Sequence, residues 1–393
     1  MNRNKNNKSK VKTKKTMLRA ILFIVIILLA CCAFYFTKKH NKVSKENEKN
    51  IITEKKENKK EEKPKVEKEK KIRLIAGGDA LIHDTVYNSA RVKGGFDFRP
   101  KLEKIKPIIK KYDLAYYNQE TILAGRELPL SNYPLFCSPT EVGDAYIDAG
   151  FNLVSLATNH TMDKGTKGVN ASLKYWNSKK DKIMFHGSAS SKKEAEKIDI
   201  REANGIKYTM LSYRMPELSN GLPSEFEYQV NNYTFEKAKK DIEKVKDKVD
   251  LLIVSMHWGV EDADYRTEKQ LKVAKELSSL GVDLILGTHS HVIQPIERVN
   301  DTVVIYSLGN FISDQIPTKN LIGDLVSMDI KLKDNKINID NIGARLMYTD
   351  ERQGYKVIPF DQLSTNTLPN KKQMYNYFKK VLTSLSNEVK MLN

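Results

Sequence analysis

From Ile72 onward, short runs rich in Val, Ile and Leu alternate with segments in which apolar residues recur every three or four positions. The short runs predict buried strands and the spaced residues predict amphipathic helices, so their alternation indicates an α/β domain. The predicted strands cover residues 72–76, 114–117, 153–156, 183–185, 208–212, 251–255, 284–286, 303–306 and 325–330. The predicted helices cover residues 100–111, 140–148, 166–178, 235–248, 265–280 and 372–391.

Polar side chains of a few types follow five of the predicted strands directly. The carboxyl ends of strands in an α/β sheet meet at one edge, where ligands bind, so these side chains are expected to lie close together. The residues singled out on this ground are Asp79, Glu120, Asn159, His160, His257, His289 and His291.

Carboxylate, amide and imidazole groups are suitable ligands for Mn²⁺, Fe or Zn²⁺. One ion needs four to six ligands, and the number of candidates at this edge points to two divalent ions. A carboxylate such as Asp79 or Glu120 would then bridge the ions, as in two-metal hydrolases. The sequence therefore predicts a dinuclear metal site of unknown metal identity.

Each group also has a simpler explanation. Asp79 follows two glycines and would serve as a turn or cap residue, Asn159 is a good helix N-cap, and Glu120 would be a surface charge. His186, beyond another strand, is interpreted as a hydrogen-bonded edge histidine. The pair His289-x-His291 after a glycine is the most specific single element, because neighbouring imidazoles at a strand exit are uncommon without a metal.

The N-terminal part has a different pattern. A basic stretch, residues 1–16, precedes an uncharged run from Ala20 to Phe36. This run is at the short end of what spans the ~30 Å hydrocarbon core of a bilayer, so residues 17–37 are expected to form a transmembrane anchor with residues 1–16 in the cytoplasm. A cleaved signal peptide and a lipoprotein site before Cys31 are the alternatives, but no A-x-A site follows the run.

Residues 38–71 consist almost wholly of Lys, Glu and Asn and are expected to form a disordered tether, although a lone charged helix is the alternative. Residues 1–71 hold 22 Lys and Arg against 8 Asp and Glu, whereas the whole chain has 67 and 49. That leaves 45 and 41 for the domain at 72–393, which is nearly neutral and is not expected to bind nucleic acid. Cys137 is the single cysteine of that domain, so neither an internal disulfide nor a Cys-based zinc site is possible there.

The order of these motifs resembles the CapA family of bacterial capsule-synthesis proteins, which includes the poly-γ-glutamate synthesis subunit and is similar to calcineurin-like metallophosphoesterases. The resemblance covers residues 72–360 and rests on Gly78-Asp79, Asn118-x-Glu120-Thr121, Ala157-Thr158-Asn159-His160 with Asp163-x-Gly165, His257-Trp258-Gly259-x-Glu261, Gly287-Thr288-His289-Ser290-His291 and Tyr306-Ser307-Leu308-Gly309-Asn310-Phe311.

The resemblance implies a sandwich of two mixed β-sheets flanked by helices. It also implies metal ligation by Asp79, Glu120, Asn159, His257, His289 and His291, with Glu120 at the bridging position and His160 as the donor to the leaving oxygen. Two departures from the superfamily matter. The usual first motif is D-x-H, whereas His83 lies four residues after Asp79, and the second motif is Asn-x-Glu.

These expectations give two hypotheses. The first is a membrane-anchored extracytoplasmic protein of capsule biosynthesis with a hydrolase-like site that acts on a phosphorylated substrate or an anionic polymer. The second is a non-catalytic subunit that binds the capsule synthase or its polymer. In both, the partners are the membrane and other synthase subunits, and the domain lies on the extracellular side of a single-pass anchor.

Overall fold

The computed structural model describes residues 29–33, 37–38, 70–218 and 224–392. Residues 29–33 and 37–38 are helical. The predicted tail, most of the predicted anchor and nearly all of the predicted tether lie outside the described residues. Within the described ranges, no helix has the length and apolar character that crossing a membrane requires.

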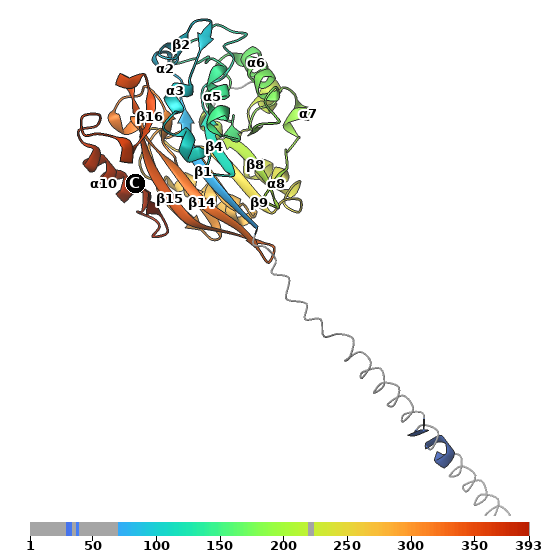
Figure 1. The fold of residues 1–393 in the computed structure, drawn as a ribbon. Coiled ribbons are helices and arrows are strands. Elements are labelled where there is room, and N and C mark those ends of the chain that lie inside the picture. Colours follow the sequence, from blue (N-terminus) through green and yellow to red (C-terminus); the bar gives the residue numbers. More distant parts are fainter. Residues whose placement is uncertain (1–28, 34–36, 39–69, 219–223, 393) are drawn as a thin grey trace, which may run out of the picture. The chain divides into compact units, whose positions relative to one another are not determined.

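Two mixed β-sheets form the centre of the domain (Figure 1). The first sheet has the order β16-β15-β14-β1-β4-β5-β6, with β13 beside β1 and β17 beside β15. Its strands are β1 (Lys70–Ala80), β4 (Leu114–Gln119), β5 (Leu153–Ser155), β6 (Met184–His186), β13 (Asn310–Ile312), β14 (Ile322–Lys333), β15 (Lys336–Asp350), β16 (Lys356–Pro359) and β17 (Lys390–Met391).

The second sheet has the order β11-β12-β10-β9-β8-β7. Its strands are β7 (Arg201–Ala203), β8 (Ile206–Arg214), β9 (Leu251–His257), β10 (Leu284–Thr288), β11 (Ile296–Val299) and β12 (Thr302–Ile305), and a separate small ribbon pairs β2 (Arg91–Val92) with β3 (Gly95–Phe96). The neighbours β1-β4-β5-β6 and β8-β9-β10-β12 are parallel, so their carboxyl ends lie at a common edge of each sheet.

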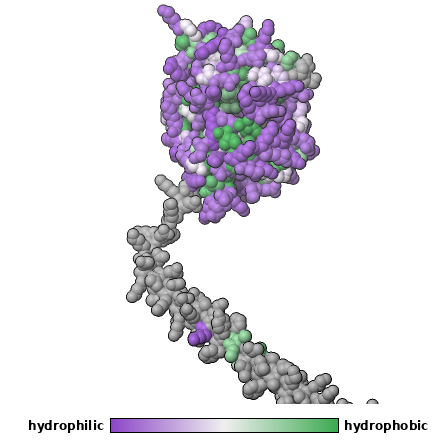
Figure 2. All heavy atoms as spheres, turned by 90° about the vertical axis from the view of Figure 1, so that its right-hand side faces the viewer, coloured by the Kyte–Doolittle hydropathy of each residue, from purple (hydrophilic) through white to green (hydrophobic). Residues whose placement is uncertain are grey.

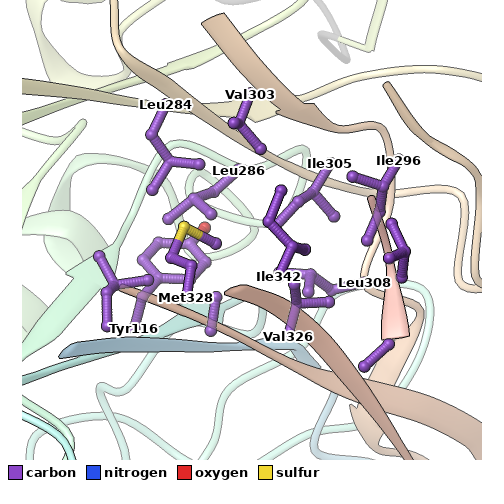
Figure 3. Close-up of a cluster of buried hydrophobic side chains, with 14 of the residues drawn as sticks. Tyr116, Leu284, Leu286, Ile296, Val303, Ile305, Leu308, Val326, Met328 and Ile342 are labelled. Atoms are coloured by element: carbon purple, nitrogen blue, oxygen red, sulfur yellow. The ribbon is translucent and has the colours of Figure 1, made fainter. Parts of the chain in front are cut away.

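The sheets pack face to face, and one apolar cluster lies between them. Tyr116 and Val326 from the first sheet, and Leu284 and Val303 from the second, belong to this cluster and are almost fully buried (Figure 3). Along β1, Leu74 packs in this cluster, whereas its neighbour Ile75 packs in the cluster on the outer face of the same sheet. Successive side chains of the strand thus point to opposite faces.

Helices cover the outer faces of both sheets. The first sheet packs its outer face against α2 (Asp84–Asn88), α3 (Arg99–Leu102), α4 (Lys106–Ile109), α5 (Glu141–Ala149) and α6 (Gly165–Asn177), and the second against α8 (Phe235–Glu243) and α9 (Glu268–Ser279). Two further helices are α7 (Lys192–Ala195) and α10 (Lys371–Leu382). The predicted α/β class with two mixed sheets and flanking helices is confirmed.

All nine predicted strands are present, but several helix boundaries were wrong. The predicted helix 100–111 is two short helices, and Pro107 in the first turn of α4 has no backbone N–H to continue the hydrogen bonding across the break. The helix predicted from 265 begins at Glu268, because Thr267 and Gln270 form a capping box. The helix predicted to reach 391 ends at Leu382, and β17 then pairs with β15.

Figure 2 shows the side of the domain on which α6, α7 and α8 lie in Figure 1. The surface on this side is mostly hydrophilic, with an apolar patch that polar residues surround. The apolar patch is therefore a local exception on an otherwise hydrophilic face.

Candidate metal centre

The centre lies where strands of both sheets end. Asp79 is near the end of β1 and Glu120 follows β4, so the first sheet contributes the carboxylates. The second sheet contributes imidazoles, because His257 is the last residue of β9 and His289 directly follows β10. The site forms only where the two sheets pack against each other.

The two carboxylates lie beside His291 and are completely buried. The Oδ2 atom of Asp79 is 3.8 Å from Nδ1 of His291, and Oε1 of Glu120 is 3.6 Å from Nε2 of the same ring. Asn118 donates from Nδ2 to Oδ1 of Asp79 over 2.7 Å, and the backbone N–H of His289 donates to Oδ2 over 3.1 Å. These bonds fix Asp79, whereas Glu120 has no comparable support.

Two further imidazoles, those of His257 and His289, also lie near Glu120. Oε1 of Glu120 is 3.9 Å from Nε2 of His257, and that nitrogen is 2.9 Å from Oδ1 of Asn159. The rings of His257 and His289 are 4.7 Å apart between centroids. All six residues predicted as ligands are therefore brought to one place, and their role in holding a metal stays a prediction.

The backbone is specialised where it carries these groups. His289 has φ of 94° and His291 has φ of 60°, in the left-handed region that side chains other than glycine seldom adopt. Such conformations cost energy and are often found at functional sites, although turns elsewhere in this chain also contain them. Gly78 is needed for a different reason: a Cβ there would lie 1.8 Å from the carbonyl oxygen of Gly309, which accepts the N–H of Asp79.

Several buried polar atoms at the centre have no hydrogen-bond partner. These atoms are both side-chain oxygens of Glu120, Oδ1 of Asn118 and Nδ1 of His289. Buried polar atoms without partners are costly, so their concentration at one point fits a site that binds a ligand. Lone pairs of carboxylate and imidazole are what a divalent cation binds, and the residues present therefore fit a metal.

Three overlapping sets of side chains have ligand atoms within 4.8 Å of one another. Asp79, Glu120 and His291 form one set, and Glu120, His257 and His289 form another, so Glu120 is common to both. A group shared by two sets is placed as a bridging ligand would be.

The protonation states also fit a cation site. Burial raises the pKa of Asp79, and it raises that of Glu120 well above its usual range, with Asp79 adding repulsion. Burial lowers the pKa of His289 to about 3 and that of His257 far below its usual range. The imidazoles are thus held neutral, as metal ligation requires, and a cation would relieve the cost of ionising the carboxylates.

His160 lies at the edge of this cluster with its own supports. Its Nδ1 is 2.8 Å from Oδ2 of Asp163, and its ring meets that of Phe136 edge to face at 4.7 Å. Asp163 also accepts the backbone N–H of Phe136 over 2.7 Å. Since Asp163 occupies Nδ1, Nε2 of His160 is the nitrogen left to exchange a proton with a ligand.

Besides Asn118 and Asp163, three residues near the centre received no role from sequence reasoning. Glu261 joins His289 and His291 in the third set of side chains, although it is exposed. Thr288 contacts Nδ1 of His257 at 3.0 Å and Asn310 contacts Nδ1 of His291 at 3.0 Å. Each of these residues lies inside one of the sequence motifs that carry the family resemblance, and this position was the available sign of a role at the site. What the motifs do not show is which side chain faces a ligand and which supports one.

Two further histidines are separate from the centre. His83 belongs to none of the three sets formed by the described residues; its Nδ1 accepts the backbone N–H of Asp314, and its ring contacts Phe136. His186 accepts the backbone N–H of Ser212 over 2.8 Å, as expected of a hydrogen-bonded edge histidine. The spacing departure in the first motif therefore places His83 outside the candidate ligand set.

Residues 73–315 match the family model described as bacterial capsule synthesis protein PGA_cap. The capsule biosynthesis protein CapA of Bacillus anthracis is 29% identical over 199 residues, which are 50% of this chain and 47% of that protein. The PGA biosynthesis protein CapA of Bacillus subtilis (strain 168) is 31% identical over 190 residues, which are 47% of this chain and 48% of that protein. The chain thus spans about half the length of either relative.

Solved structures show a more distant likeness. The NAD nucleotidase of Haemophilus influenzae has a TM-score of 0.44 and 12% identity, over 82% of this chain and 57% of that chain. A 5′-nucleotidase precursor of Thermus thermophilus has a TM-score of 0.43 and 10% identity, over 79% of this chain and 58% of that chain. At this level the likeness does not indicate a shared activity.

Proposed function

The chain belongs to the PGA_cap family of bacterial capsule synthesis proteins, and we propose that its domain is a metal-dependent phosphoesterase of capsule biosynthesis. One observation carries this proposal. Glu120 is buried without a hydrogen-bond partner and is shared by two sets of side chains that each offer ligand atoms to a cation.

The proposed ligands are Asp79, Glu120, Asn159, His257, His289 and His291, holding two divalent ions. When bound, such ions act as Lewis acids that activate a water and neutralise charge on a phosphoryl group. The side chains and the fold supply the remaining requirements. The neutral imidazoles and buried carboxylates would hold the ions in position, and the two packed sheets exclude bulk water from the site.

His160 is proposed as the proton donor to the leaving oxygen. Asp163 accepts a hydrogen bond from Nδ1 and so orients the ring. The contact with Phe136 limits the tilt of the ring. Nε2 is then the nitrogen that we propose delivers the proton.

The test compares two histidines. We expect His291→Ala to lose bound metal and hydrolysis of a phosphodiester together, because it removes a proposed ligand. We expect His160→Ala to keep its metal and to lose about 10²–10³ in kcat, with a smaller loss for substrates with good leaving groups. His83→Ala is the matched control, because this nearby histidine lies outside the sets of ligand atoms.

Metal content, hydrolysis and capsule yield would be measured on each folded variant. A folded, metal-free His291→Ala protein that sustains normal capsule yield would overturn the enzymatic function. The non-catalytic subunit would then be the better description.

The setting of the domain is part of the same proposal. Residues 17–37 are proposed to anchor the domain at the outer face of the cell membrane, supported by the uncharged run from Ala20 to Phe36. The proposed partners are other synthase subunits, and the proposed substrate is the anionic polymer or a phosphorylated precursor. Protease added to intact protoplasts should remove the domain; protection would place it on the other side.

A further inference from the structure

A cavity lies beside β6 and β7, the edge strands of the two sheets, and none of its lining comes from the metal centre. It has a volume of about 260 Å³ and is lined by α6, β6, α7, β7 and the segment at 228–231. This size is just under that of typical small-molecule sites. None of the seven residues proposed for the metal centre and its proton donor lines it.

The cavity has an apolar part and a polar part. Leu173, Phe185 and Ala195 contribute apolar surface. His186 also lines it, and Nδ1 of this ring already accepts the backbone N–H of Ser212 over 2.8 Å. A neutral ring in this position carries its proton on Nε2, which is then available to donate to a ligand.

The neutral state of His186 has a physical cause. Burial lowers the pKa of His186 to about 4. The ring is therefore a neutral donor near physiological pH. It contributes a directed hydrogen bond to the cavity and no charge.

The charges around the cavity leave one cation without a carboxylate. Lys197 pairs with Glu194 at 2.6 Å, and Arg201 pairs with Asp199 at 2.9 Å. In the part of the chain that the structure describes, no carboxylate pairs with Lys180, which also lines the cavity. The cavity thus offers one available ammonium group beside an apolar surface.

We propose that this cavity binds a small organic monocarboxylate with a short aliphatic segment. Lys180 pairs with the carboxylate, His186 donates to a carbonyl or carboxylate oxygen, and Leu173 and Phe185 contact the aliphatic segment. The site is independent of the metal centre and does not rest on phosphoesterase activity.

The composition favours a carboxylate over a phosphate. A phosphate dianion is usually bound by several cations or by the free fork of an arginine. Here the guanidinium of Arg201 is already used, because it donates to Asp199 and to the carbonyl oxygens of Lys180 and Ile183. A single ammonium and one neutral donor match a monoanion.

The test measures binding directly on the purified full chain. The probe is butyrate, a monoanion with a short aliphatic segment, followed by calorimetry and by the ring NMR signals of His186. We expect Lys180→Glu to weaken binding about tenfold or more, because it replaces attraction by repulsion at the same site. We expect Ala195→Trp to abolish binding by filling the cavity.

Lys193→Glu is the matched control, because it makes the same charge change on α7 at an exposed residue outside the cavity lining. Binding should be unchanged in this variant. It should also persist after metal chelation and should not be displaced by millimolar inorganic phosphate.

Three results would overturn the proposal. If Lys180→Glu and Ala195→Trp bind the probe as tightly as the wild type does, the probe does not bind in this cavity. Loss of binding on chelation would place the probe at the metal centre instead. Displacement by phosphate at a concentration similar to that of the probe would show that the cavity binds anions in general and does not select a carboxylate. None of these results depends on whether the metal centre hydrolyses a phosphoester.

Discussion

Glu120 and Asp324 are both carboxylates that the fold buries completely, and neither oxygen of either group has a hydrogen-bond partner. Their surroundings differ. Glu120 lies within 4 Å of nitrogen atoms of His257 and His291 at the end of β4. Asp324 lies in β14, where no other ionisable side chain shifts its pKa and burial is the main cause of the rise.

The comparison shows that burial without a partner does not by itself indicate a ligand site. An isolated buried carboxyl group avoids the cost of its charge by remaining protonated, as the raised pKa of Asp324 indicates. A carboxylate among neutral imidazoles has a second solution, because a cation can bind all of these groups. The surrounding imidazoles therefore distinguish the centre, and four predictions test this distinction.

The largest expected effect comes from changing Glu120 itself. Glu120→Gln keeps the shape but removes the negative charge that two cations would share. We expect metal content to fall and phosphodiester hydrolysis to decrease by about 10³-fold or more. Metal analysis and steady-state kinetics on the purified protein measure both effects.

Asp324→Asn is the matched control for Glu120→Gln. It makes the same chemical change at the other buried carboxyl group and should leave metal content and kcat unchanged. Equal losses in the two variants would show that burial alone, and not the imidazole surroundings, explains the effect.

The second prediction concerns metal removal. A cation that binds the native state and not the unfolded chain stabilises it by about 4 kcal/mol when its free concentration is about 1,000 times Kd. We expect chelation to lower the unfolding temperature of the wild type and to leave that of His291→Ala unchanged. Calorimetry with and without chelator measures this difference. An unchanged wild type would contradict metal binding at this centre.

The third prediction concerns the groups that support the imidazoles. Thr288→Val should weaken metal binding about 10–100-fold, because the hydroxyl that contacts Nδ1 of His257 orients the ring. Competition with a chelator of known affinity measures the change. Thr302→Val is a suitable control, since that buried hydroxyl donates to the backbone of Val282, away from the centre. Similar losses in both would indicate general destabilisation.

Sequence patterns predicted the centre of each parallel strand well, because those strands are short and continuously apolar. They missed β15, although it has fifteen residues. Charged and amide residues interrupt its apolar alternation, Asn341 has φ of 52°, and the register with β14 shifts between Ser327 and Asp329. A bulge of this kind reverses the faces along a strand and conceals its period of two.

The candidate site was predictable because its residues follow the carboxyl ends of five strands, three in the first sheet and two in the second, which lie together where the sheets pack. Residues that act through tertiary contacts were not predictable in the same way. Asn310 reaches His291 from β13, nineteen residues later in the chain, and Asp324 gave no signal at all. Its burial depends on the packing of β14, and no local pattern distinguishes it from the exposed aspartates.

The smallest effect is expected for stability at Asp324, and its sign follows from the raised pKa. The native state keeps the proton of Asp324 to higher pH than the unfolded chain does. The stability that this carboxyl group contributes is therefore complete below the unfolded pKa of about 4, and it is lost as pH rises toward the native pKa.

The stability of Asp324→Asn does not depend on pH in this way, because the amide does not titrate. We expect this variant to be more stable than the wild type near pH 7.5. The gain should be only on the order of 1 kcal/mol, because the buried amide is also left without hydrogen-bond partners, and it should disappear near pH 4. Urea unfolding of both proteins in chelator at the two pH values separates this effect from metal binding. A variant that is less stable at both would mean that the carboxyl group has a native partner that an amide cannot replace, and the contrast with Glu120 would then be lost.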